Sequence, residues 1–196
     1  MRRLAQALGV EAMTLYHYVA NKDDLLAAIV DIVVRAIELP DPAGDWKGEL
    51  RKAAVSAHAV IGRHPWSARL MLSSDAVLTG RMRYMDAILG TLREAGFSAR
   101  LTDHAYHSLD SHVLGFSLWV AAIQPDPDQL ADRASDVLAT LPREEYPWLV
   151  EHIEGHLAPD DGGSSFEFGL DLILDGLERL LAADGRAGNR RPRAGT

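Results

Sequence analysis

The sequence contains no cysteine. Disulfides, thiolate metal sites and a cysteine nucleophile are therefore excluded, and the absence agrees with a reducing compartment. No uninterrupted apolar run approaches the roughly 18 residues that a membrane-spanning helix needs. The N-terminus lacks a charged-then-apolar export signal. We therefore expect a cytoplasmic protein that has no membrane partner.

Signals for catalysis are also missing. No serine stands in a nucleophile-elbow context, no glycine-rich phosphate loop follows a strand, and no zinc-protease motif is present. The carboxylates are scattered over helical faces, where solvation accounts for them. We predict that the chain is not an enzyme and needs no cofactor.

Alternation at period two is absent over any useful length, whereas apolar residues recur at helical spacing throughout. The 196 residues, 47% of them hydrophobic, can bury a core in one main domain plus a small appendage. We predict an all-α fold. Residues 1–40 form an N-terminal unit with a connecting helix over 22–39, residues 41–183 a helical body, and residues 184–196 a disordered tail.

Two short helices and a tight turn open the chain. Leu4, Ala5 and Leu8 repeat at helical spacing up to Gly9, where a helix would stop, and a second helix is predicted over 12–19. This layout is a helix-turn-helix, whose second helix can enter a DNA groove. That helix buries one apolar stripe, formed by Ala12, Leu15 and Val19.

The other side chains of this second helix are hydroxyl, imidazole and aromatic groups that suit phosphates and base edges. Lys22 follows in the first turn of the next helix, where free amides favour an oxyanion. The predicted DNA-binding residues are Thr14, Tyr16, His17, Tyr18 and Lys22. The alternative for either tyrosine is packing against the third helix.

Charge is distributed unevenly along the chain. The net charge is −8, yet residues 1–22 hold three basic groups against one acidic group, and residues 184–196 hold four against one. A weakly basic head on an acidic body fits a protein that touches DNA with one end. Random fluctuation over short windows is the alternative.

The first thirty residues resemble the DNA-binding region of the TetR family of transcriptional repressors, close to the tetracycline-repressor branch. Family members have a further helix before this motif, and this chain begins at Met1 inside the supporting helix. Either the true start lies upstream or the helix is lacking. The residues that carry the resemblance are Leu4-Ala5, Leu8-Gly9-Val10, Thr14 to Val19, Asn21-Lys22 and Leu25-Leu26.

The resemblance implies a helical body that binds a ligand and dimerises through two helices. The long helix over 102–123 and the last helix over 164–183 are apolar on more than one face, so each has a face to bury outside its own core. Ordinary core helices of a monomer are the alternative. The predicted interface residues are Leu109, Val113, Phe116, Val120, Phe166, Leu170, Ile173 and Leu177.

A small ligand needs an apolar pocket with a few polar groups. Such residues also fill any helical core. The predicted ligand-binding residues are His64, Trp66, Met71, His112, Phe116 and Trp119.

Two histidine pairs have a spacing that allows metal binding, namely His104 with His107 and His152 with His156. The tetracycline branch recognises its drug as a magnesium chelate, which makes the question relevant. No third ligand is fixed by spacing, so we predict no metal site.

These features together predict a homodimeric repressor that binds a palindromic operator in double-stranded DNA. A small hydrophobic or drug-like effector would move the helix over 22–39, change the spacing of the two heads and lower DNA affinity. The alternative is a ligand-binding or interaction protein with a truncated, non-functional DNA-binding head.

Overall fold

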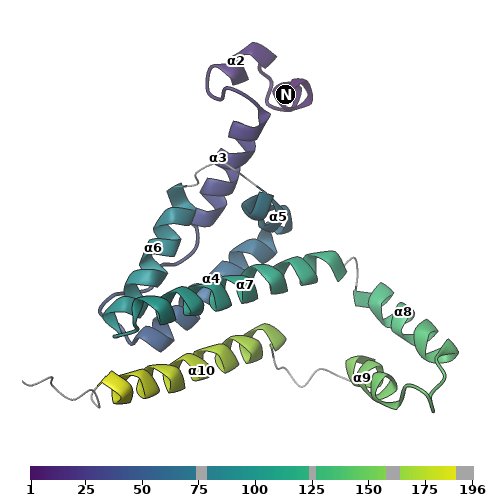
Figure 1. Cartoon of the computed structure of the whole chain (residues 1–196). Helices are drawn as coiled ribbons and strands as arrows, with labels where there is room; N and C mark the ends of the chain where they lie inside the picture. Colours follow the sequence, from purple (N-terminus) through teal and green to yellow (C-terminus); the bar gives the residue numbers. More distant parts are fainter. Residues whose placement is uncertain (74–78, 124–126, 158–163, 189–196) are drawn as a thin grey trace, which may run out of the picture.

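A computed structural model describes residues 1–73, 79–123, 127–157 and 164–188. All the regular structure in these ranges is helical, which confirms the predicted all-α fold (Figure 1). The helices are α1 (Arg2–Ala7), α2 (Ala12–Tyr16), α3 (Lys22–Arg35), α4 (Trp46–Arg63), α5 (Pro65–Ser73), α6 (Thr79–Glu94), α7 (Ala99–Ile123), α8 (Pro127–Thr140), α9 (Pro147–Leu157) and α10 (Ser165–Gly188).

Local capping explains several helix boundaries. The Asn21 side chain accepts a hydrogen bond from the Asp24 amide (2.8 Å), and the Asp45 side chain accepts one from the Gly48 amide (2.9 Å). Each satisfies an amide that has no partner inside its helix. After α6, Gly96 takes a φ of 97°, a conformation that glycine adopts without strain.

Some boundaries differ from the prediction. α2 ends at Tyr16, before the predicted end at residue 19. α9 begins at Pro147, because proline disfavours a helical conformation in the residue before it and suits the first helical position. α10 continues to Gly188. Residues 184–188 of the predicted tail are therefore helical, and residues 189–196 lie outside the described residues.

The body is built from α4, α5, α6, α7 and α10, with most of α3 packed against them. Its core is a continuous cluster of buried apolar side chains, among them Leu50, Ile61, Leu92, Phe97 and Leu174. Polar contacts join α4 to α10 along their edges. Arg51 binds Glu167 and Asp171 at 2.6 and 2.8 Å.

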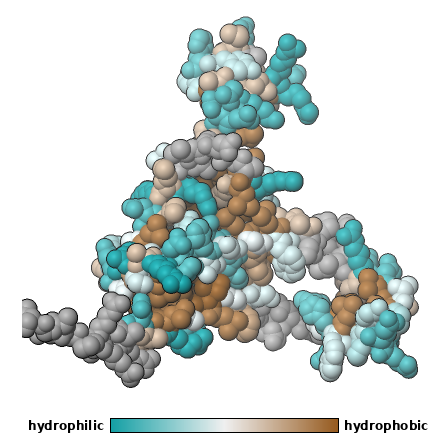
Figure 2. Space-filling model, viewed as in Figure 1, coloured by the Kyte–Doolittle hydropathy of each residue, from teal (hydrophilic) through white to brown (hydrophobic). Residues whose placement is uncertain are grey.

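The head consists of α1 and α2, which pack on each other. From the head, α3 continues into the body and carries Val30, Val33 and Val34 into the core (Figure 1). On the face shown in Figure 2, hydrophilic residues dominate the head, and apolar surface gathers on the body.

Beyond α7, helices α8 and α9 form a two-helix arm (Figure 1). Within the described ranges these two helices contact each other and none of the other helices. Their large exposed apolar side chains are Val137, Trp148, Leu149 and Leu157. In the described residues, no helix is both long and apolar enough to cross a membrane.

Candidate DNA-binding head and effector region

The turn between α1 and α2 has a specific backbone geometry. Gly9 adopts a φ of 67°, and the amides of Gly9 and Val10 donate to the carbonyls of Gln6 (3.2 Å) and Ala5 (3.0 Å). This double hydrogen bond is a Schellman motif, which ends a helix with a left-handed residue. The glycine thus sets the angle at which the chain enters α2.

Helix α2 and the turn after it display the predicted DNA-binding side chains. Thr14, Tyr16, His17 and Tyr18 are all exposed, and Lys22 is exposed at the start of α3. Neither tyrosine is therefore buried against α3. Leu15 and Val19 are half-buried, as predicted for the stripe that faces the protein; the side chain of Ala12 lies outside the described residues.

The structure brings together three of the predicted ligand-binding residues on α7. The ring of Phe116 lies 5.9 Å from that of His112 and 5.5 Å from that of Trp119. Two further rings complete this aromatic cluster, His58 from α4 and Phe166 from α10. His58 stacks on Phe166 at 4.0 Å, and His112 stacks on it at 4.9 Å.

Both histidines of the aromatic cluster make hydrogen bonds. His112 Nε2 donates to the backbone carbonyl of Phe166 (2.9 Å), since a carbonyl oxygen only accepts. His58 Nδ1 lies 3.0 Å from Ser117 Oγ. Burial, with a smaller contribution from nearby His112, lowers the pKa of His58. The cluster therefore offers aromatic faces beside the imidazole of His58, whose neutral form is favoured by burial.

The remaining predicted ligand-binding residues lie apart from this cluster. His64 and Trp66 flank the break between α4 and α5, with ring centroids 6.0 Å apart. Met71 is buried in the main core. A structural role explains Met71 without a ligand, which is the alternative the sequence left open.

The predicted dimer interface needs a correction. Leu109, Val113, Phe166, Leu170 and Leu177 are buried inside the protomer, so they have almost no surface to offer a second copy. Phe116, Val120 and Ile173 are half-buried. The exposed apolar side chains of α7 and α10 are others, namely Trp119, Phe168, Leu172 and Leu180. Periodicity identified two apolar faces, and for these five buried residues it assigned the wrong face to the surface.

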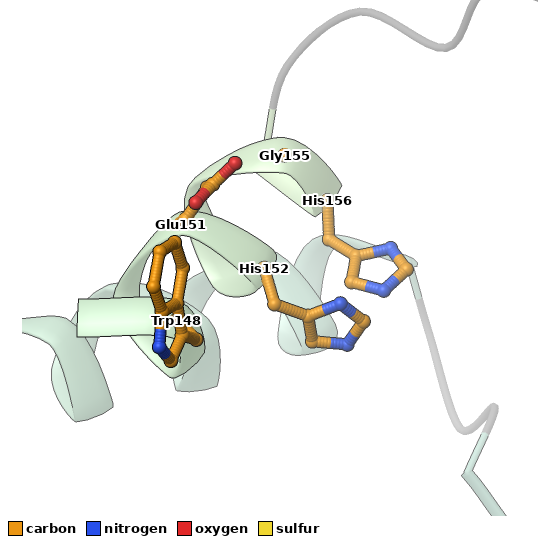
Figure 3. A pocket seen from close by; sticks show the side chains of 5 residues that line it. All are labelled: Trp148, Glu151, His152, Gly155 and His156. Atoms are coloured by element: carbon orange, nitrogen blue, oxygen red, sulfur yellow. The ribbon is translucent and has the colours of Figure 1, made fainter. Parts of the chain in front are cut away.

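Among the described residues, neither histidine pair has a third metal ligand beside it. In the described residues no group of three or more His, Cys, Asp or Glu side chains is placed to hold a metal. His152 and His156 line a shallow hollow of about 460 Å³ on α9. Their rings project to the same side, and the Glu151 carboxylate points away from them (Figure 3).

The other histidine pair lies on α7. His107 Nε2 is 3.5 Å from Asp103 Oδ1. Asp110, which follows one turn later, is engaged by Arg81 at 2.7 Å. Its carboxylate is thereby committed to an ion pair between α6 and α7.

Sequence reasoning missed the residues that join elements distant in the chain. Asp31 was not singled out, and it accepts a hydrogen bond from the backbone of α6. Phe166 was assigned to the dimer interface and instead lies between two imidazoles. No sequence pattern announces either contact, because both depend on how the helices pack.

A small helix-turn-helix head, joined by one helix to a larger helical body, defines a DNA-binding transcriptional regulator. Residues 39–181 match the family described as Tetracyclin repressor-like, C-terminal domain. Together with the relatives described next, this match shows that the chain belongs to the TetR family of transcriptional regulators, a class of proteins that are not enzymes.

Three relatives illustrate the similarity. The HTH-type transcriptional repressor DrrR1 of Streptomyces coeruleorubidus is 32% identical over 197 residues, which cover 93% of this chain and 70% of DrrR1. The class D tetracycline repressor protein of Escherichia coli is 32% identical over 192 residues, or 93% of this chain and 81% of that protein. The Streptomyces coelicolor TetR family protein ActR, solved in complex with actinorhodin, superposes with a TM-score of 0.76 at 28% identity, covering 92% of this chain and 87% of ActR.

Proposed function

We propose that the chain acts in the cytoplasm as a homodimeric repressor whose two heads bind a palindromic operator. A small hydrophobic or drug-like effector binds in the body and lowers DNA affinity. The effector acts by favouring an arrangement of the heads that fits the operator poorly. Such coupling is typically worth about 1–3 kcal/mol.

The observation that carries this proposal is the set of side chains displayed by the head. Tyr16, His17 and Tyr18 are exposed at the end of α2 and in the turn after it, and α2 packs on α1 alone among the described helices. Three neighbouring side chains with aromatic or imidazole rings thus form one exposed surface that is free to contact a partner. Contacts to base edges and phosphates account for their exposure.

Few basic groups assist this head. Residues 1–22 contain three basic side chains, Arg2, Arg3 and Lys22, which are all exposed, and one acidic side chain, Glu11. Each phosphate neutralised contributes to affinity and to its salt dependence, so three contacts give a weak nonspecific term. Sequence-specific affinity then depends on the groove contacts and on two heads binding at once.

The aromatic cluster supports the effector site. His58, His112, Phe116, Trp119 and Phe166 supply stacking surface with a few polar atoms, which is how apolar pockets orient planar ligands. ActR, a relative with the same fold, was solved with actinorhodin bound. We propose that an aromatic effector contacts Trp119 and Phe116 first, since Trp119 is exposed and Phe116 is half-buried.

The exposed apolar stripe of α10 supports the homodimer. Phe168, Leu172 and Leu180 recur at spacings of four and eight along one face of α10, and nothing in the described protomer covers them. The arm formed by α8 and α9 also lacks packing partners within the described protomer. A second copy would bury both surfaces and set two heads side by side.

Selection of bound sequences from random DNA, followed by titration of the selected site, tests the proposed function. The expected site is a palindrome whose half-sites lie about one helical turn, roughly 34 Å, apart. The complex should contain two chains. Enrichment of no sequence, together with binding that depends only on salt, would reject operator recognition and leave the body as a ligand-binding protein.

A further inference from the structure

Asp31 joins α3 to α6 through a charged hydrogen bond. Its Oδ1 accepts from the Gly80 amide at 2.5 Å, and its Oδ2 accepts from Arg35 Nε at 2.7 Å. Both carboxylate oxygens are thus engaged, and the side chain is only 18% exposed. Burial alone would raise the pKa of Asp31, but the Gly80 amide and Arg35 outweigh it and lower the pKa. The carboxylate is therefore held in its charged form.

Gly80 is suited to this contact. It lies in α6, and its backbone amide donates to the Asp31 carboxylate. A Cβ at this position would lie 3.0 Å from Asp31 Oδ1 and 3.2 Å from the Asp31 carbonyl oxygen. The close approach of α3 to α6 therefore favours glycine, since a methyl group would push the two helices apart.

This contact stands out among the interactions of α3. In the described residues it is the only side-chain hydrogen bond from α3 to another helix. The other contacts of α3 with the body are apolar, through Val30, Val33 and Val34. Apolar contacts are non-directional and tolerate sliding, whereas a hydrogen bond fixes position and direction.

The position of the contact along α3 means that a small tilt there moves the head by a larger distance. Asp31 lies nine residues beyond Lys22, so about 14 Å of helix separates the contact from the start of α3. A tilt of about 10° at Asp31 would move the start of α3 by roughly 2.5 Å. Hydrogen bonds to bases tolerate far less than this displacement. Any loosening at Asp31 is therefore large enough to matter in the groove.

We propose that the Asp31–Gly80 hydrogen bond is the latch that holds the head in register with the body, and that Asp31 is a positioning residue for DNA binding. The latch deepens the proposed function and rests on it for its consequence at the operator.

Two variants break the latch by different means. Asp31→Ala removes the acceptor, and Gly80→Ala inserts a methyl group between the two helices. Asp110→Ala is the matched control. Asp110 also pairs with an arginine, is 16% exposed and contacts α6, but it joins α6 to α7 and leaves α3 alone. The Asp110→Ala variant should therefore destabilise the body without changing the position of the head.

The position of the head is measured directly by pulsed electron spin resonance. The chain has no cysteine, so Gln6→Cys in the head and Glu94→Cys at the end of α6 give two unique labelling sites. Excess unlabelled protein restricts the signal to pairs within one chain. We expect a narrow distance distribution for the parent and the Asp110→Ala variant, and a broader or shifted one for both latch variants.

Affinity for the selected operator should fall roughly tenfold in the latch variants and stay within about twofold of the parent in the control.

The outcomes separate the latch from the proposed function. An unchanged distribution with unchanged affinity in Asp31→Ala and Gly80→Ala overturns the latch, and so does equal broadening in Asp110→Ala. If the parent binds no selected DNA while the latch variants still broaden the distribution, the operator proposal fails and the latch stands.

Discussion

The imidazole of His58 lies nearly parallel to the ring of Phe166, with centroids 4.0 Å apart and 12° between the planes. This stack joins α4 to the first turn of α10, and His112 of α7 lies on the same ring. Three helices that are distant in the sequence therefore meet at one phenylalanine. Changes to these side chains should affect stability and effector binding together.

Stability should decrease in mild acid because of His58. Its pKa is lowered below 6.5 by burial and by His112, so the unfolded chain binds the proton more readily than the folded chain. Neutral His58 contributes fully to the free energy of unfolding above about pH 6.5, the pKa of the unfolded chain. This contribution is lost as the pH falls from there through the lowered pKa of the folded chain. Urea unfolding of the parent and of His58→Gln from pH 8 to pH 5 measures this. His58→Gln should show a shallower loss below pH 6.5. The difference between the two proteins at pH 8 gives the packing cost alone. Parallel curves over the whole range would contradict the assignment.

Gly169→Ala should destabilise the protein by about 1–3 kcal/mol, the usual cost of overpacking. A Cβ at this position would lie 2.6 Å from Cε1 of His112, which has to leave its place against Phe166. Gly90→Ala is the matched control, because it also lies inside a helix and a Cβ there meets nothing within 4 Å. It should gain about 0.5–1 kcal/mol from the lower flexibility of the unfolded chain. Thermal unfolding of both variants measures these changes in stability. If Gly169→Ala left the stability unchanged, His112 would have room to move.

The ion pairs of Arg51 should contribute little to stability. Arg51 and its partners Glu167 and Asp171 are all partly exposed, so solvent screens the attraction despite short distances. We expect Arg51→Met to cost at most about 1 kcal/mol, and the cost should shrink between about 0.05 M and 0.5 M salt. Lys52→Met, which removes a pair inside α4 alone, controls for the loss of a surface charge. A loss above roughly 3 kcal/mol that is indifferent to salt would show that the pair behaves as a buried one.

Leu172→Glu should convert the proposed homodimer to a monomer. Leu172 is 56% exposed on the uncovered face of α10, where a second copy would bury it. A carboxylate at the centre of an apolar interface loses its hydration without gaining a partner. Met82→Glu changes a side chain of similar exposure, 58%, on α6 and should leave the dimer intact. Sedimentation of both variants measures the association, and circular dichroism checks that each remains helical. A Leu172→Glu variant that still sediments as a dimer would exclude this face.

Local signals in the sequence predicted the helices well. Asn21 and Asp45 belong to the residue types that favour helix N-caps, and each caps the helix that follows it, because capping depends on residues within one turn. Gly9 and Gly96 end helices for the same kind of local reason. The exposure of the second helix of the head also followed from spacing alone.

These local signals did not predict the contacts between helices. The apolar stripe that includes Leu170 faces the core and the stripe that includes Leu172 faces solvent, and only packing decides which is which. Asp31 looks like any solvated helix carboxylate in the sequence. Its partner is a backbone amide forty-nine residues away, and a backbone amide carries no sequence signature.

Operator affinity of Tyr16→Ala, compared with Tyr146→Ala, tests the central claim most directly. The two tyrosines are equally exposed, 45% and 44%, but Tyr16 lies on α2 and Tyr146 precedes α9. On the operator selected by the parent protein, Tyr16→Ala should weaken binding by roughly tenfold or more, the usual cost of a lost base contact. Tyr146→Ala should bind as the parent does, and both variants should keep its association state and melting temperature. Equal affinities for all three proteins would contradict the assignment of α2 as the helix that reads DNA.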